Sequence, residues 1–261
     1  MRPPADRDMA LQDAHQRVAR EFPSSGGSRM TRELLRRGGA VNHKRVYRLM
    51  REDNLLCLRK RKFVVTTDSN HGLPVYPNLA RRMTLTGLDQ LWVADLTSIR
   101  LELEFVYWAV ILDAFSRRGI GWALDRELST ELTLQALGMA IERRRPAPGL
   151  VHHSDRGVQN ARHDYTALLR EHGIEIGMSR KANPWDNAAC ESFLKNLKYE
   201  EVYRTEYRDL ADARVSLGVF LEKVYNQERL HSALGCLPPA EFERGLLAQT
   251  HKEAAARHYS L

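Results

Sequence analysis

Three successive apolar segments constrain the fold of this 261-residue chain more than any other feature. Residues 91–99, 104–113 and 119–124 are rich in β-branched and aromatic side chains, which is typical of strands. Residues 150–153 and 174–178 have the same character, and a helical segment separates them. Three strands in series followed by alternating helices and strands predict an α/β fold, a mixed five-stranded sheet with helices on its faces.

Helix signals surround these strands. Helices are expected over residues 129–144, with Ser129 as N-cap, over residues 162–172, in a segment that Asp186 caps and that carries Glu191, and over residues 209–226.

The N-terminal region predicts a small all-α module. After a polar helix over residues 1–21, a short helix over residues 30–37 and a second one that Asn42 caps form a helix-turn-helix pattern. In the second helix Val46, Leu49 and Met50 recur at helical spacing and are expected to pack on Leu34 and Leu35. Lys44, Arg45 and Arg48 are left on the outer side, where we expect them to contact DNA.

Charge is divided unevenly along the chain. Residues 1–82 carry 18 Lys+Arg against 8 Asp+Glu, a net charge of +10, whereas the remainder carries 22 against 25, a net charge of −3. A basic front end on a mildly acidic body suggests a module that binds a polyanion, and nucleic acid is the obvious one. Charge alone fits a solvated surface equally well, and the helix-turn-helix pattern favours DNA.

Other classes of protein are disfavoured. No run of 18 apolar residues and no secretory leader is present, so we expect a cytoplasmic, nucleoid-associated protein without membrane contact. Cys57, Cys190 and Cys236 lie far apart, which predicts reduced thiols and neither a zinc site nor a disulfide framework.

Three acids stand out by their positions. Asp95 lies within the first apolar strand, Asp155 directly follows the fourth strand, and Glu191 lies on the helix after the fifth. A carboxylate in a core strand is costly unless it meets a cation or a donor. Carboxylates that converge from two strands and a helix can hold two Mg²⁺ ions, one to activate the attacking oxygen and one to stabilise the leaving oxygen.

Neighbouring groups offer rival interpretations. Asp113 ends the second strand, and a structural turn role with Ser116 and Arg117 is favoured over a catalytic one. His152 and His153 resemble metal ligands by type, but their place in a strand favours support or packing.

The motifs around the three acids carry a family resemblance. Trp92-Val-Ala-Asp-Leu-Thr97, His153-Ser-Asp-Arg-Gly-Val-Gln159 and the segment 179–193 resemble the DDE motif of the retroviral-integrase superfamily, most closely that of IS-three-type insertion sequences. Tyr225-Asn-Gln-Glu-Arg-Leu-His-Ser-Ala-Leu234, followed by Pro238-Pro-Ala-Glu-Phe242, is similar to the C-terminal signature of that group.

This resemblance implies an RNase H-like fold and a transposase. Water would cleave a phosphodiester at an element end, and the freed 3′-hydroxyl would then join to another phosphodiester, through a figure-eight and an excised circle. Two Mg²⁺ ions are implied as cofactors, with Mn²⁺ able to substitute. The implied partners are the terminal repeats and target DNA, the protein of the upstream reading frame, and a second copy of the chain.

Further DNA contacts are expected near Glu191. Lys195 and Lys198 lie at i+4 and i+7 from Glu191 on the same helical face, and Asn187 lies at i−4. Lys181 belongs to a basic loop that could follow a DNA strand. The alternative for each lysine is a solvated surface charge.

The expected organisation has five parts: a helix-turn-helix module over residues 1–62, a linker over 63–86, the catalytic core over 87–200, a helical extension over 201–246 and a tail over 247–261. An active transposase is the leading function. A decayed or regulatory DNA-binding protein would bind DNA without needing the three acids together. An RNase H-type nuclease would cut RNA–DNA hybrids and would not need the C-terminal helical motif.

Overall fold

A computed structural model describes residues 6–53, 76–155, 163–179 and 188–258 of the chain. The chain divides into two compact units, one formed by Met1–Val64 with Arg229–Pro238 and the other by Val65–Glu228 with Pro239–Leu261. None of the helices in the described ranges is long and apolar enough to cross a membrane.

The first unit contains three helices, α1 (Asp6–Glu21), α2 (Gly27–Arg36) and α3 (His43–Glu52). The predicted cap of α3 is confirmed, because the Asn42 side chain accepts a hydrogen bond from the Lys44 amide at 2.8 Å. Its buried face consists of Val46, Leu49 and Met50, as predicted, but only one of the two expected α2 partners is buried. Leu34 is buried, whereas Leu35 is 43% exposed.

The second unit is built on one mixed sheet in the order β3-β2-β1-β4-β5. The strands are β1 (Leu91–Arg100), β2 (Phe105–Asp113), β3 (Gly119–Asp125), β4 (Val151–Ser154) and β5 (Glu175–Met178). The first three pair as antiparallel neighbours, and β4 pairs in parallel with both β1 and β5. The predicted five-stranded α/β sheet is confirmed.

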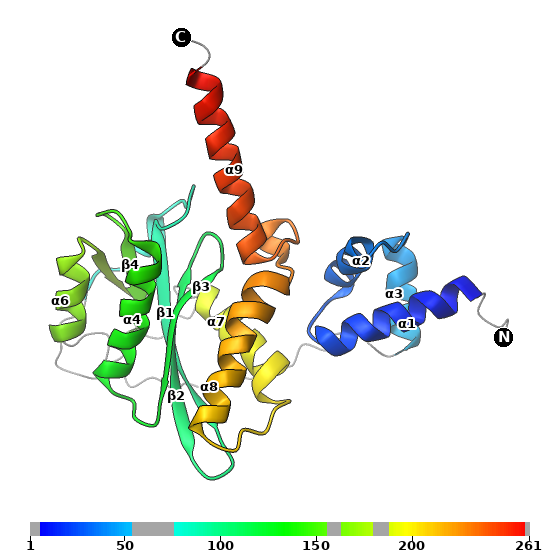
Figure 1. Cartoon of the computed structure of the whole chain (residues 1–261), viewed down its shortest axis with the longest axis horizontal. Coiled ribbons are helices and arrows are strands. Elements are labelled where there is room, and N and C mark those ends of the chain that lie inside the picture. The colour runs from blue at the N-terminus through cyan, green and yellow to red at the C-terminus, as the bar shows by residue number, and fades with distance from the viewer. Residues whose placement is uncertain (1–5, 54–75, 156–162, 180–187, 259–261) are drawn as a thin grey trace. The chain divides into compact units, whose positions relative to one another are not determined.

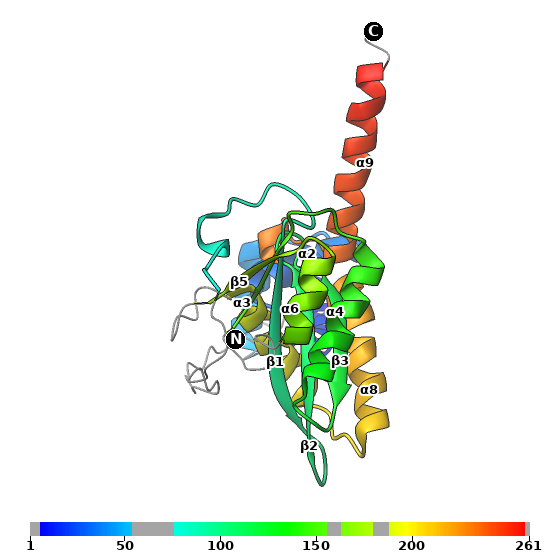
Figure 2. The same cartoon turned by 90° about the vertical axis from the view of Figure 1, so that its left-hand side faces the viewer.

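Helices cover both faces of this sheet (Figures 1 and 2). One face carries α4 (Thr130–Arg144) and α6 (His163–Glu171). The other carries α7 (Ala188–Leu197), the π-helical η3 (Lys198–Val202), α8 (Leu210–Val219) and the π-helical η4 (Phe220–Glu228). The remaining described elements are two short 3₁₀ turns, η1 (Ala80–Arg82) and η5 (Ser232–Leu234), and helix α9 (Pro239–His258).

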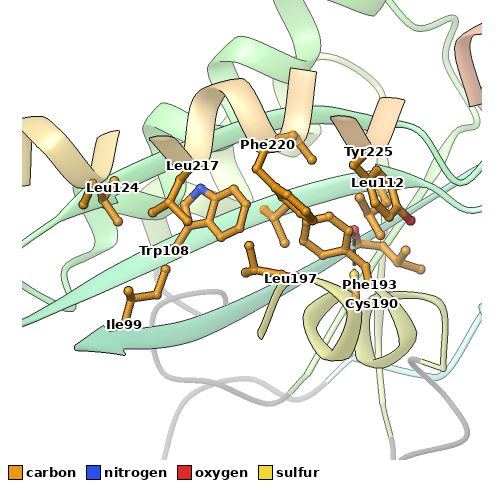
Figure 3. Close-up of a cluster of buried hydrophobic side chains, with 14 of the residues drawn as sticks. Ile99, Trp108, Leu112, Leu124, Cys190, Phe193, Leu197, Leu217, Phe220 and Tyr225 are labelled. Carbon is orange, nitrogen blue, oxygen red and sulfur yellow. Dashed lines mark hydrogen bonds between the residues drawn. The ribbon is translucent and has the colours of Figure 1, made fainter. Parts of the chain in front are cut away.

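Two hydrophobic clusters follow from the strand alternation. In β1, Trp92 and Ala94 pack against α4 and α6, whereas Leu91 and Val93 face α7 and α8. Figure 3 shows the second cluster, in which Cys190, Phe193 and Leu197 of α7 meet Trp108 of β2 and side chains of α8 and η4. The core therefore fixes α7 against the strand that carries Asp95.

The helix expected over residues 209–226 differs from the observed structure. Asp209 caps it as an N-cap should, but α-helical geometry ends at Val219 and the chain continues as η4. Asn226 at its end is buried and holds the start of β3, since its amide donates to the Gly119 carbonyl and accepts from the Gly119 amide, both at 2.9 Å. Asp186, the expected cap of α7, lies outside the described residues.

Candidate active site

Asp95 projects from the middle of β1 toward the α7 face. Side chains alternate along a strand, so Asp95 shares the face of Leu91 and Val93. The Asp95 carboxylate accepts a hydrogen bond from the Leu96 amide at 2.8 Å. This placement turns an acidic group of a core strand toward the helix that carries Glu191.

Asp155 reaches the same face through the register of β4. Leu91 pairs with Val151 and Val93 with His153, and this parallel register, extended two residues further, aligns Asp95 with Asp155. Asp155 directly follows β4 and is half-buried. Two acids that are 60 positions apart in the sequence are therefore neighbours across adjacent strands.

Helix α7 presents Glu191 beside these acids. Cys190, Phe193 and Leu197 are fully buried and fix the inner face of the helix, and the Cys190 thiol donates to the Val93 carbonyl at 3.3 Å. Val93 lies two residues before Asp95 on β1. Glu191 itself remains exposed, so its carboxylate lies at the surface next to the strand.

The charges of the three acids interact. Burial, then the charge of Asp155 and, less strongly, that of Glu191 raise the pKa of Asp95 to about 7, in spite of the opposing effects of the Leu96 amide and Lys198. Partial burial also raises the pKa of Glu191. A cation placed among these carboxylates would relieve both the repulsion and the desolvation of the buried acid.

The donor set fits Mg²⁺ in chemistry. Carboxylate oxygens are the hard ligands that this ion prefers, and Mg²⁺ commonly takes one or two carboxylates and completes its shell with water and substrate phosphate. Within the described ranges no three acidic, histidine or cysteine side chains gather closely enough to hold an ion by themselves. Solvent and phosphate oxygens would therefore have to supply part of each shell.

Of the residues near the acids that are expected to contact DNA, the structure describes only some. Lys195 is exposed on α7, and Lys198, the first residue of η3, is half-buried and close enough to influence Asp95. Lys181 and Asn187 lie outside the described residues. In the first unit Lys44 and Arg48 are exposed on α3, whereas Arg45 is half-buried.

The rival residues have structural partners. Asp113 is buried and accepts hydrogen bonds from the amides of Asp89, Phe115 and Ser116 at 2.7–3.0 Å, which confirms the turn role. The His152 Nε2 atom forms a hydrogen bond with the Tyr165 hydroxyl at 2.9 Å, and the His153 Nε2 atom forms one with the Ser179 hydroxyl at 3.0 Å. Both histidines are buried, as expected for supporting residues.

Several residues that hold the elements around the candidate site together were not predicted from the sequence. The ring of Tyr225 packs edge-on against Phe193 with centroids 4.7 Å apart, two residues from Glu191. Glu243 of α9 is buried and forms ion pairs with Arg118, at 2.6 Å, and with Arg144. The C-terminal motif indicated that this region belongs to the family's fold. No local pattern in the sequence indicates which strand or helix each of its side chains contacts.

Comparison with known protein families defines the class of this chain. Two family models described as "Integrase core domain" match residues 86–184 and 172–239, and a model described as "HTH-like domain" matches residues 6–63. The chain is thus an integrase-core protein with a helix-turn-helix-like N-terminal region.

Two relatives narrow the class. The chain is 38% identical over 235 residues to an insertion element IS600 protein of 31 kDa from Shigella sonnei, across 90% of this chain and 85% of that protein. It is 35% identical over 224 residues to transposase InsF for insertion sequence IS3A from Escherichia coli K12, across 85% of this chain and 78% of InsF. The chain belongs to the IS3-type family of insertion-sequence transposases, which are polynucleotidyl transferases.

Solved integrase structures are more distant. A simian T-cell lymphotropic virus intasome chain, solved with PP2A regulatory subunit B56 gamma, aligns at a TM-score of 0.49 and 15% identity, covering 88% of this chain and 74% of that one. The HTLV-2 integrase catalytic core, solved in complex with magnesium, aligns at a TM-score of 0.46 and 14% identity, covering 59% and 96%.

Proposed function

We propose that this transposase cleaves and joins DNA strands at element ends through Asp95, Asp155 and Glu191. The observation that supports the proposal best is that Asp95 of β1, Asp155 at the end of β4 and Glu191 of α7 lie on one face, where burial and the charges of Asp155 and Glu191 raise the pKa of Asp95. Acids that disfavour one another's ionised forms destabilise a protein unless a cation compensates them, so this arrangement favours a metal-dependent reaction.

The three carboxylates would hold two Mg²⁺ ions, with Mn²⁺ as a substitute. When bound, the ions would activate the attacking oxygen and stabilise the leaving oxygen of an in-line displacement. The role of the chain is to fix the carboxylates: β1 and β4 hold Asp95 and Asp155 in register, and the buried side chains of α7 hold Glu191 beside them. Lys195 and Lys198 would bind phosphates of the DNA end.

The reaction has two displacements of the same kind. Water attacks the phosphodiester at an element end, the bond to the 3′-oxygen breaks and a 3′-hydroxyl is released. That hydroxyl then attacks a second phosphodiester: its oxygen bonds to the phosphorus, the bond from this phosphorus to its own 3′-oxygen breaks, and a new 3′-hydroxyl is released as the strands join. DNA held by Lys44, Arg45 and Arg48 of the helix-turn-helix would supply the ends, with the upstream-frame protein and a second copy of the chain as partners.

Joining on a labelled, pre-nicked element-end duplex tests the proposal. Wild type and Glu191→Gln are compared in Mg²⁺, Mn²⁺ or chelator, with the upstream-frame protein added in a parallel arm. Glu142→Gln, at an exposed acid of α4, is the matched control. We expect metal-dependent joining by wild type and the control and none by Glu191→Gln. DNA binding without joining in every arm would instead identify a decayed or regulatory protein.

A further inference from the structure

The helix that carries Glu191 continues into an exposed pair of aromatic rings. Tyr199 is 44% exposed and Tyr203 is 67% exposed, and their rings meet edge-on with centroids 5.5 Å apart. The role proposed for the site assigns nothing to either ring. Two neighbouring exposed rings offer flat faces on which planar groups such as nucleic-acid bases can stack.

These rings extend a row that begins at the proposed site. Glu191, Lys195, Tyr199 and Tyr203 follow one another at intervals of four residues. In an α-helix each such step overshoots a full turn by about 40°, so the row would spiral away from its starting face. A π turn holds more residues, and four of them fall short of a full turn. Because η3 is π-helical, the last step turns Tyr203 back toward the face of Glu191.

The π turn is firmly held. The Tyr203 amide donates to the Lys198 carbonyl at 2.9 Å, a five-residue bond of the π type. Glu201 accepts hydrogen bonds from the Tyr207 hydroxyl at 3.1 Å and the Ser216 hydroxyl at 2.6 Å. The contact with Ser216 anchors η3 to α8, so the backbone that carries the two tyrosines is held in place.

The charges along the row suit a nucleic-acid strand. Lys195 is exposed, and the positive charge of Lys198 reaches Asp95, so the start of η3 lies next to the acids. The two acids within η3 are directed elsewhere, because Glu200 is buried and Glu201 binds hydroxyl groups of the neighbouring chain segments. Lysine beside exposed rings is the combination that binds phosphate and stacks bases of single strands.

We propose that Lys195, Tyr199 and Tyr203 form a surface for the unpaired DNA strand at an element end, with a phosphate at Lys195 and bases stacked on the two rings. This proposal rests on the proposed function, since it places the strand that leads into Asp95, Asp155 and Glu191. Stacking does not depend on base identity, so the surface would hold the end without reading its sequence.

The test measures binding without chemistry. Full-length protein is titrated, in chelator, with a labelled duplex that carries a five-nucleotide single-stranded overhang and with the same duplex made blunt. Tyr199→Ala and Tyr203→Ala are expected to weaken binding of the overhang duplex by about tenfold each and to leave the blunt duplex nearly unchanged, since stacking acts on unpaired bases. Tyr203→Phe keeps the ring and is expected to bind like wild type.

Control variants distinguish stacking on these two rings from a general effect of losing an exposed aromatic side chain. Phe105→Ala removes a 58% exposed ring elsewhere in the same unit and is expected to change neither affinity. Equal losses on both duplexes, no loss, or a loss in Tyr203→Phe as large as in Tyr203→Ala would overturn the proposal. So would a shift of the alanine variants to a smaller oligomer in sedimentation, which would assign the rings to a contact between copies.

The binding test can be interpreted whether or not the protein cleaves and joins DNA. Overhang-specific losses without metal-dependent joining by wild type would support the surface and remove the proposed function. Normal joining with unchanged overhang binding by the alanine variants would overturn the surface and leave the function in place. Thermal unfolding of each variant checks that η3 still folds.

Discussion

The buried carboxylate of Asp95 destabilises the metal-free protein to an extent that depends on pH. Its pKa of about 7 lies well above the ordinary value of 3.8 because burial and Asp155 disfavour the ionised form. Ionisation of Asp95 therefore lowers the unfolding free energy of the metal-free protein. This loss is absent below pH 4, grows as the pH rises and is complete above pH 7. Such a shift is worth at most about 4 kcal/mol.

We therefore expect Asp95→Asn to raise the free energy of unfolding of the metal-free protein at pH 8 by roughly 1–4 kcal/mol. Urea denaturation in chelator at pH 4 and pH 8 measures the effect, which should be much smaller at the lower pH. If Asp95→Asn were less stable than wild type at pH 8, the ionised Asp95 carboxylate would not destabilise the protein.

His152 has the opposite pH dependence. Burial, and secondarily the charge of His153, lower its pKa to about 3 from 6.5, so the folded state holds it neutral against the Tyr165 hydroxyl. Its stabilising contribution is complete above pH 6.5 and is lost as the pH falls toward 3. His152→Gln keeps a hydrogen-bonding group but cannot titrate. Between pH 7 and pH 4 the variant should lose less unfolding free energy than wild type, as measured by urea denaturation. Equal losses would show that protonation of His152 does not cause the loss of stability in acid.

Residue roles were predictable where local context decided them. Asp113 precedes a turn, and His152 and His153 lie in an apolar strand, so their structural roles followed from the sequence and were confirmed. Leu35 was predicted wrongly, because adjacent helix positions point about 100° apart and cannot both face α3.

Among the elements, β3 packs closely on α4 at a glycine, Gly121. A Cβ atom at Gly121 would lie 2.2 Å from the Ala136 carbonyl oxygen and 2.9 Å from the Ala140 Cβ. Gly121→Ala must push α4 off the sheet, and we expect a loss of about 1–3 kcal/mol in unfolding free energy.

Gly138 on the same helix is the matched control. Nothing lies within 4 Å of a Cβ atom there, so Gly138→Ala should stabilise α4 by about 0.5–1 kcal/mol. Denaturation of both variants under one set of conditions gives the comparison. Similar effects of the two substitutions would mean that the packing of β3 on α4 is looser than described.

Element boundaries were predictable where caps mark them, as at Asn42 and Ser129. The change from α8 to η4 was not predictable, because apolar spacing is nearly the same in both geometries. What distinguishes η4 is the pair of bonds from Asn226 to Gly119, a contact between residues 107 positions apart. The helical extension was expected to end at residue 246, whereas α9 continues to His258 through the expected tail. Its anchor, Glu243, pairs with arginines far away in the sequence.

At the scale of the whole molecule, charge is concentrated at the front of the chain. The net charge of +10 over residues 1–82 predicts DNA binding that weakens steeply with salt. Each phosphate contact removed should lower the slope of log affinity against log salt by about one. We expect this change for Lys44→Gln and for Arg48→Gln, measured by anisotropy on duplex DNA. An unchanged slope would place the phosphate contacts elsewhere.

The arrangement of the molecule was predictable in outline. The order of strands and helices followed from apolar patterns, whereas the role of the three acids, which their motifs indicate, stays a prediction. The convergence of Asp95 and Asp155 depends on the parallel register of β1 and β4, which is set by long-range pairing. The proximity of Glu191 depends on buried contacts of α7, such as the Cys190 bond to Val93, that no spacing in the sequence reveals.

Counting the bound metal ions tests most directly whether Asp95, Asp155 and Glu191 form a two-metal site. Mn²⁺ bound to the complex of the protein with element-end DNA is measured by electron paramagnetic resonance for wild type, Asp95→Asn, Asp155→Asn, Glu191→Gln and the control Glu142→Gln. We expect two ions per catalytic site in wild type and the control, and fewer in each of the other three variants. An unchanged count in those three variants would contradict this expectation.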